Sequence, residues 1–235
     1  MARVPIPGQT KSRLSANGGI SVDLAAAVAA AMLRCTVQRV RLLGRVIVAC
    51  TPDDGGPELD RALAGLEGPD LRVVPQGGGD LGTRMARLWQ TVGDSEPVAF
   101  LGADAPDVPI DALMAIPREV QSHAVAIGPT DDGGYWTIAG RRCSPELFVD
   151  IDWGTGRVYH QSCERARAQH LDVRVLPPWQ DVDQPADLDR LRHGLRLASR
   201  QWSGPDAGPD SDALAFRELA STLDRLLPPL ESSDL

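Results

Sequence analysis

The chain has 235 residues and a formal net charge of −8 at pH 7. Surfaces that bind nucleic acid or anionic membranes carry excess positive charge, so this balance argues against both partners, although a few local cations or a bridging metal suffice to bind a nucleotide. An apolar fraction of 43% supports a sizeable core, and no stretch is long and apolar enough for a signal peptide or a membrane span. The four cysteines form no CxxC pair, which favours buried free thiols in a reducing cytoplasm over a zinc or redox site.

The first feature along the chain is a loop over residues 4–14 (VPIPGQTKSRL) that contains Lys11, the only lysine of the sequence. Pro7 and Gly8 are typical of a turn. A compact ammonium on a flexible stem, with Arg13 nearby, suits a phosphate group. The alternative is an ordinary solvated loop lysine.

Beyond this loop, short apolar segments alternate with helical patterns. Strands are predicted over residues 46–50, 71–74, 98–101, 124–127, 135–138 and 173–176, and helices over residues 22–41, 57–66, 81–92, 110–116, 158–169 and 185–198. This alternation predicts an α/β protein, a three-layer α/β/α sandwich whose sheet is mostly parallel and carries helices on both faces. The Gly133-Gly134 turn before a strand predicts one antiparallel excursion.

The two ends of the chain depart from this pattern. A phosphate loop in a parallel α/β sheet normally follows a strand, yet residues 1–5 are too short and too rich in proline to supply a central one. We therefore expect the first strand to be missing. Glycine and proline in residues 203–211 indicate a linker. The expected division is a domain over residues 1–200, a linker over 201–212 and a helical tail over 213–235, either docked or loosely attached.

Three aspartates are candidate metal ligands. Asp104 directly follows a strongly apolar strand, where a carboxylate faces the ligand crevice and suits a divalent ion that bridges phosphates. The alternative is a turn cap ahead of Pro106. Asp181 and Asp183 point the same way if their segment is extended, but Asp183 before Gln-Pro is also a good helix N-cap.

Two glycine-rich segments are candidate binding loops. Residues 76–84 (QGGGDLGTR) open a helix, where glycines allow close approach to a ligand and the helix N-terminus favours an anion. A flexible connection is the competing interpretation. Residues 128–136 (GPTDDGGYW) place acidic and aromatic side chains together, as a sugar or acceptor site requires, although Asp-Gly-Gly is also a tight turn by itself. Trp153 and Thr155 have the same character and could equally be plain packing.

Taken together, six ordered segments resemble a bacterial family of nucleotide-diphospho-sugar transferase-like proteins, of the arsenosugar-biosynthesis glycosyltransferase type. This family belongs to the GT-A-like group, which also contains 2-phospho-lactate guanylyltransferase. The matching segments are residues 3–14 (RVPIPGQTKSRL), 79–85 (GDLGTRM), 102–106 (GADAP), 128–135 (GPTDDGGY), 153–155 (WGT) and 181–188 (DVDQPADL). Arg3 replaces the family's usual lysine, Ser12 replaces its usual threonine, and the family's first strand is absent.

The resemblance implies a GT-A, Rossmann-like fold and a transferase that acts on a nucleotide-activated substrate with Mg2+ or Mn2+. It implies Lys11, Arg13 and Asp132 as catalytic residues, and Asp104 with Asp183 or Asp181 as metal ligands. The substrate-binding residues that it implies are Pro7, Gly8, Gly79, Asp80, Leu81, Gly82, Arg84, Gly133, Gly134, Tyr135, Trp153 and Thr155.

Three functional hypotheses follow. The first is glycosyl transfer from a nucleotide-diphospho-sugar to a small-molecule acceptor. The second is nucleotidyl transfer from a nucleoside triphosphate, which uses the same phosphate loop and metal but releases pyrophosphate. The third is a non-catalytic or degenerate nucleotide-binding protein, because the expected loss of the first strand suggests loss of activity.

Overall fold

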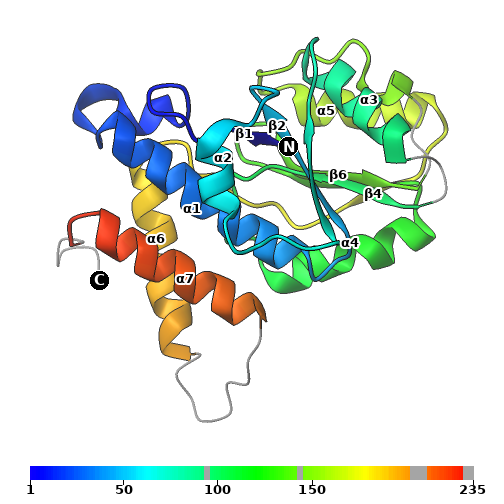
Figure 1. Cartoon of the computed structure of the whole chain (residues 1–235). Helices are drawn as coiled ribbons and strands as arrows, with labels where there is room; N and C mark the ends of the chain where they lie inside the picture. The colour runs from blue at the N-terminus through cyan, green and yellow to red at the C-terminus, as the bar shows by residue number, and fades with distance from the viewer. Residues whose placement is uncertain (93–95, 142–144, 202–210, 230–235) are drawn as a thin grey trace.

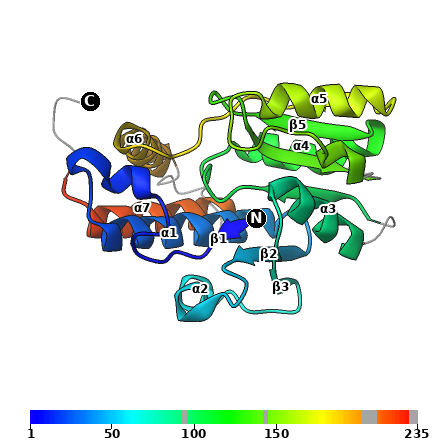
Figure 2. The same cartoon turned by 90° about the horizontal axis from the view of Figure 1, so that it is seen from above.

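The computed structural model describes residues 1–92, 96–141, 145–201 and 211–229. It is an α/β protein in which helices cover both faces of the strands (Figures 1 and 2). The strands are β1 (Ala2–Arg3), β2 (Val46–Thr51), β3 (Leu71–Pro75), β4 (Val98–Leu101), β5 (Val125–Pro129), β6 (Tyr135–Gly140) and β7 (Val173–Val175). The helices are α1 (Val22–Val40), α2 (Gly56–Leu63), α3 (Leu81–Val92), α4 (Ile110–Ser122), α5 (Val158–Ala168), α6 (Pro185–Gln201) and α7 (Ser211–Leu226), with short 3-10 helices η1 (Ser12–Gly18) and η2 (Pro145–Phe148).

The strands form two hydrogen-bonded groups, in the orders β1-β2-β3 and β4-β6-β5-β7. The pairs β1–β2, β2–β3 and β5–β7 are parallel, whereas β6 runs antiparallel to both β4 and β5. The predicted α/β class and the antiparallel excursion after Gly133-Gly134 are therefore confirmed. Because β4, β5 and β7 run in the same direction, the β5–β6 hairpin lies at the edge of the sheet where β4 and β7 also end.

A two-residue strand, β1, stands where the sequence predicts a missing first strand. It pairs only with Cys50 and Thr51 at the end of β2. The ammonium of Met1 donates a hydrogen bond to the carbonyl oxygen of Leu101, at 2.9 Å, and so connects β1 to the end of β4. This short segment is the bridge between the two groups of strands.

Two helical layers enclose the strands. On one face α3, α5 and η2 pack against β4, β5 and β6 through an apolar cluster that includes Trp89, Phe100 and Phe148. On the other face α4 packs against β5 and β6, and α1 and α2 pack against β2. None of the helices in the described ranges is both long and apolar enough to cross a membrane.

The helix α4 is longer than predicted. The sequence predicts an end at residue 116, because Pro117 lacks an N–H and clashes with the preceding turn. The structure continues α4 to Ser122 with Pro117 inside it. The apolar face made by Ala112, Ile116 and Val120 is buried, and this packing offsets the hydrogen bond that the proline removes.

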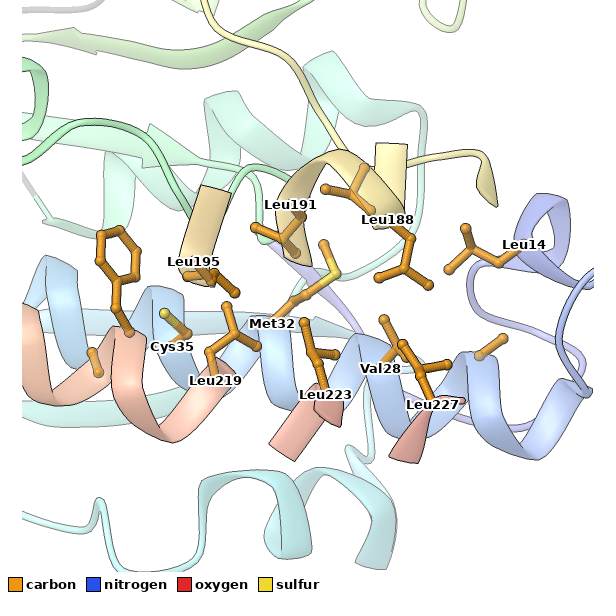
Figure 3. Packing of buried hydrophobic residues seen from close by; sticks show 14 residues of the cluster. Leu14, Val28, Met32, Cys35, Leu188, Leu191, Leu195, Leu219, Leu223 and Leu227 are labelled. Atoms are coloured by element: carbon orange, nitrogen blue, oxygen red, sulfur yellow. The ribbon is translucent and has the colours of Figure 1, made fainter. Parts of the chain in front are cut away.

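The C-terminal helix α7 packs along α1, and α6 lies across both (Figure 3). Leu219 and Leu223 of α7 interlock with Met32 of α1 and Leu191 of α6 in one buried cluster, which Leu14 of the N-terminal loop extends. The predicted linker falls largely on residues 202–210, outside the described residues. The helix after it packs against α1 and α6 through a buried face that includes Phe216, Leu219 and Leu223.

Candidate functional site

The loop after β1 is built by local hydrogen bonds. Its Thr10 hydroxyl donates to the carbonyl oxygen of Val4 at 2.6 Å. The amide of Gln9 donates to the carbonyl oxygen of Ile6 at 3.0 Å, with Pro7 and Gly8 at the two central positions and Gly8 at φ 74°. This is the arrangement of a type II turn, which favours proline followed by glycine. Pro7 and Gly8 therefore shape the loop that carries Lys11.

Lys11 is held in an uncommon conformation with its ammonium inside the protein. Its backbone is left-handed, at φ 52° and ψ 40°, immediately before η1. Such a conformation is strained for a residue with a side chain and persists where the surroundings impose it. The Lys11 side chain is only 7% exposed. A solvated loop lysine, the alternative considered from the sequence, does not have this burial.

The ammonium of Lys11 joins two of the predicted metal ligands. Its Nζ lies 2.5 Å from Oδ1 of Asp104 and 2.9 Å from Oδ1 of Asp183. Arg13 approaches the other side of Asp183, with 2.9 Å between Nη1 and Oδ2. Burial lowers the pKa of Lys11, but the charges of Asp104 and Asp183 and their hydrogen bonds outweigh it, so the net pKa is raised. The lysine is therefore fully charged in this site.

These groups meet because three strands deliver them to one edge. The Lys11 loop follows β1, Asp104 follows β4, and Asp183 lies in the segment after β7. The amide of Val182 donates to the carbonyl oxygen of Asp104 at 2.8 Å and fixes the last two segments together. Asp187, in the first turn of α6, accepts from the amides of residues 183 and 184 at 3.1 and 2.8 Å and so fixes the segment that enters the helix, while the Asp183 carboxylate faces Lys11 and Arg13.

Asp181 and Asp132 lie in the electrostatic field of the same cluster. The pKa of Asp181 is raised to about 6, chiefly by burial and then by the charges of Asp183 and Asp132, while Lys11 opposes the shift. Asp132 also closes the β5–β6 hairpin, because its Oδ1 accepts from the Thr130 hydroxyl at 2.6 Å and from the Gly134 amide at 2.9 Å. The site thus contains more carboxylates than cations.

The remainder of the hairpin packs against the loop before α5. Gly133 has φ 84°, and a Cβ there would lie 2.1 Å from the carbonyl oxygen of Gly156. The carbonyl oxygen of Gly133 accepts from the amide of Tyr159 at 2.8 Å. The hydroxyl of Tyr135 contacts the sulfur of Met85 at 3.8 Å. Gly133 is therefore explained by close packing against the backbone of Gly156.

The glycine-rich loop is attached to β1 and β2 by a residue that the motifs did not single out. The Gln76 side chain is buried, and its Nε2 donates to the carbonyl oxygens of Ala2 at 3.1 Å and Ala49 at 2.9 Å. Arg84 donates to the side-chain oxygen of Gln76 at 3.3 Å and to the carbonyl oxygen of Gly79 at 2.8 Å. The signal that the sequence offered for this role was a glutamine directly before three glycines.

The other predicted binding residues have local partners. Asp80 caps α3 by accepting from the amide of Thr83 at 2.8 Å, and hydrogen bonds from Thr83 lower the pKa of Asp80. Leu81 begins α3 and is partly exposed. Gly82 allows close approach, since a Cβ there would lie 2.4 Å from the carbonyl oxygen of Phe148 and 2.8 Å from the indole nitrogen of Trp153. Thr155 donates to the carbonyl oxygen of Asp152 at 2.7 Å within a turn.

The donor atoms around Lys11 fit a hard divalent cation. Two carboxylate oxygens already converge on one cation, the Lys11 ammonium. The described residues contain no cluster of three or more His, Cys, Asp or Glu side chains arranged to hold a metal. Mg2+ is commonly bound by one or two carboxylates and completed by substrate phosphates and water, so two convergent oxygens match that ion better than a metal held by protein alone.

Comparison with known proteins places the chain in a family. The model of a family described as "Uncharacterized protein conserved in bacteria (DUF2064)" matches residues 33–155, just over half of the chain. The crystal structure of a proposed nucleotide-diphospho-sugar transferase from Desulfovibrio desulfuricans G20 is 30% identical, with a TM-score of 0.72, and the match covers 96% of this chain and 95% of that one. No curated protein matches the chain.

A second solved structure shows the same fold at low identity. A cytidylyltransferase from Leptospira borgpetersenii serovar Hardjo-bovis (strain JB197) is 10% identical, with a TM-score of 0.51, and the match covers 95% of this chain and 91% of that one. Lys11 and Asp183 lie outside the residues that the family model matches. The predicted resemblance to nucleotide-diphospho-sugar transferase-like proteins is confirmed, and the chain belongs to the bacterial family DUF2064.

Proposed function

We propose that this protein is a metal-dependent glycosyltransferase that uses a nucleotide-diphospho-sugar donor. The observation that carries the proposal is the convergence of Lys11, Arg13, Asp104 and Asp183 at the strand edge where α/β proteins bind nucleotides. The similarity to a proposed nucleotide-diphospho-sugar transferase, over almost the whole of both chains, supports the same class of donor.

In this proposal the cations of the N-terminal loop bind the diphosphate. Lys11 and Arg13 neutralise the negative charge that grows on the departing nucleoside diphosphate as the sugar–oxygen bond breaks. Arg13 is largely exposed and can follow a ligand, and the buried Lys11 starts from a defined place between Asp104 and Asp183. The glycine-rich loop after β3, held by Gln76 and Arg84, lines the nucleoside.

Asp104 and Asp183 would hold Mg2+ or Mn2+, with Asp181 as a further carboxylate close by. When bound, the ion supplies Lewis-acid stabilisation of the diphosphate oxygens. Asp132 and Tyr135, in the hairpin at the same edge, orient the sugar or the small-molecule acceptor. The electrostatic coupling of Asp132 to Asp181 supports this arrangement, because it links the hairpin to the carboxylates of the metal site.

Nucleotidyl transfer is the second candidate. The observation in its favour is the shared fold of the Leptospira cytidylyltransferase, whose match spans more than nine-tenths of both chains. The same cations and carboxylates would then stabilise pyrophosphate as the leaving group. The two reactions differ in the bond that breaks, and so in the product that is released.

The test is to incubate the purified protein with Mg2+ and either a panel of labelled nucleotide-sugars or a panel of labelled nucleoside triphosphates. Release of nucleoside diphosphate from a nucleotide-sugar supports glycosyl transfer, and release of pyrophosphate from a triphosphate supports nucleotidyl transfer. Asp104→Asn is the matched control, since it keeps the shape of the side chain while removing its charge. Binding of nucleotide by both proteins, equal with and without EDTA and without any turnover, would overturn the proposal in favour of a degenerate nucleotide-binding protein.

A further inference from the structure

The Lys11 ammonium occupies the place that a divalent cation would take. It lies 2.5 Å from one oxygen of Asp104 and 2.9 Å from one oxygen of Asp183, and these two residues follow different strands. The Lys11 side chain is buried while its partners Asp104 and Asp183 are 54% and 32% exposed, and a buried ammonium with two anionic partners is strongly held. An ion that uses the same two oxygens must first replace this ammonium.

The backbone supports this placement. Lys11 is one of the few non-glycine residues with a positive φ in the described part of the chain, together with Asp150 and His170. The carbonyl oxygen of Lys11 accepts from the amide of Leu14 at 3.0 Å, and the side chain of Leu14 is buried in the cluster under α1, α6 and α7. The strained conformation is therefore fixed by the core, and it directs the only lysine of the chain toward Asp104 and Asp183.

The charges predict the consequence of replacing the ammonium. If a divalent ion entered alone, the ammonium would remain within a few ångströms of it, and two positive charges at that distance repel strongly in a partly buried site. A lysine has a flexible four-carbon stem and can follow a new anionic partner. A diphosphate that enters with the ion provides this partner next to the vacated carboxylates.

We propose that Lys11 is an ion-exchange residue that blocks the carboxylate pair until a metal–diphosphate complex enters as a unit, when its ammonium transfers from Asp104 and Asp183 to the diphosphate oxygens. This inference rests on the proposed function in one respect, namely that the ligand is a metal-bound diphosphate. Beyond the proposed function, the inference is that a free divalent ion binds poorly to Asp104 and Asp183 because Lys11 competes with it.

The first experiment measures Mn2+ binding to the full chain by electron paramagnetic resonance, without any phosphate. Lys11→Met removes the competing charge at similar length, and should bind Mn2+ at least about tenfold more tightly than the wild type, since loss of one charge-assisted contact is worth that factor or more. Lys11→Arg keeps the charge and should give no comparable gain. Arg3→Met is the matched control, because Arg3 is an exposed cation at the start of the same loop whose guanidinium donates to the carbonyl oxygen of Gln9 at 3.0 Å; it should change affinity by about twofold or less.

The second experiment needs no variant. Because Lys11 is the only lysine, incorporation of lysine labelled with 13C at Cε gives a single side-chain signal in an NMR spectrum. Mg2+ alone should leave this signal in place. Mg2+ with inorganic pyrophosphate should shift it, as the ammonium leaves the two carboxylates for the diphosphate.

The outcomes separate this inference from the proposed function. If Lys11→Met binds Mn2+ no more tightly than the wild type, or if Mg2+ alone shifts the Lys11 signal as the mixture does, the ion-exchange role is wrong while metal-dependent transfer stands. If neither Mn2+ nor the mixture of Mg2+ and pyrophosphate binds to the wild type or to any variant, both proposals are wrong. A variant that does not fold leaves the NMR measurement on the wild type to decide.

Discussion

Arg39 of α1 and Asp212 at the start of α7 form a buried ion pair, with 2.5 Å between Nε and Oδ1 and side-chain exposures of 1% and 5%. A third partner is the carbonyl oxygen of Pro106, which accepts from Nη1 of Arg39 at 2.6 Å. The guanidinium carbon also lies 4.1 Å from the centre of the Phe216 ring. One arginine thus connects α7 to the loop that carries Asp104.

Breaking this ion pair is expected to destabilise the protein strongly. Asp212→Ala leaves the Arg39 charge buried without its carboxylate, which costs about 3–5 kcal/mol of unfolding free energy. Denaturant titration followed by circular dichroism measures the loss. The control is Glu96→Ala, since the Arg45–Glu96 pair is mostly exposed and should cost less than about 1 kcal/mol. Equal effects of the two substitutions would show that α7 is not held through Arg39.

The docking of α7 predicts a difference between two of its leucines. Leu223 is fully buried between α1 and α6, so Leu223→Ala should lower the unfolding free energy by about 2–5 kcal/mol. Leu214 lies on the same helix but is 53% exposed, and Leu214→Ala should change the unfolding free energy by less than about 0.5 kcal/mol. A loosely attached helix would instead give small, similar values for both variants in the same chemical denaturation experiment.

Gly133 is predicted to be intolerant of any side chain. Gly133→Ala introduces a Cβ 2.1 Å from the carbonyl oxygen of Gly156 at a positive φ, and should cost about 2 kcal/mol or more, because strain and overlap combine. Gly154 offers a matched control, since its φ is 79° but a Cβ there would meet no atom within 4 Å. Gly154→Ala isolates the backbone strain at about 1 kcal/mol. The two thermal unfolding curves should therefore differ clearly.

The amino group of Met1 predicts a pH dependence of stability. Burial lowers the pKa of this ammonium to about 6, against an ordinary value of 8.0, and Asp104 only partly opposes the shift. Between these values the unfolded chain binds more protons, so the unfolding free energy should rise by about 2 kcal/mol from pH 6 to pH 8. The sample is protein that begins at Met1, and urea titrations across this range provide the measurement.

An engineered apolar segment before Met1 is the companion test. It removes the buried ammonium and offers partners to β2, whose pairing with β1 is limited to Cys50 and Thr51. The extended protein should be more stable at every pH and should lose the dependence between pH 6 and pH 8. If the extension gives neither effect, the space between β2 and β4 is closed in another way.

Most strands and helices were predicted well from the sequence, because their apolar residues have the spacing typical of buried strands and amphipathic helices. The strand over residues 98–101 and the helix over residues 81–92 have the bounds expected from their apolar pattern. The predicted end of α4 at residue 116 was wrong. Pro117 favours a helix end by its local geometry, but the buried face of the helix continues beyond it. The order of the strands could not be read from local pattern, since the position of β6 between β4 and β5 depends on contacts far apart in the chain.

The candidate site was predictable in part. Strand-end positions and the resemblance together pointed to Lys11, Asp104 and Asp183, which the fold brings into contact. What could not be predicted is that the Asp183 carboxylate pairs with Lys11 and Arg13 and does not cap α6, because these partners are distant in the sequence. The role of Gln76 was also not predicted, since its partners are carbonyl oxygens of β1 and β2.

The burial of Lys11 has a practical consequence for labelling chemistry. A protein normally presents many lysines to amine-reactive dyes and cross-linkers, but this sequence contains only Lys11, to which protein prepared to begin at Met1 adds one α-amine. Lys11 is 7% exposed, and the Met1 ammonium is buried against Leu101. Reagents that acylate primary amines should therefore leave the folded protein almost unmodified. The rate of acylation then reports how often the N-terminal segment opens.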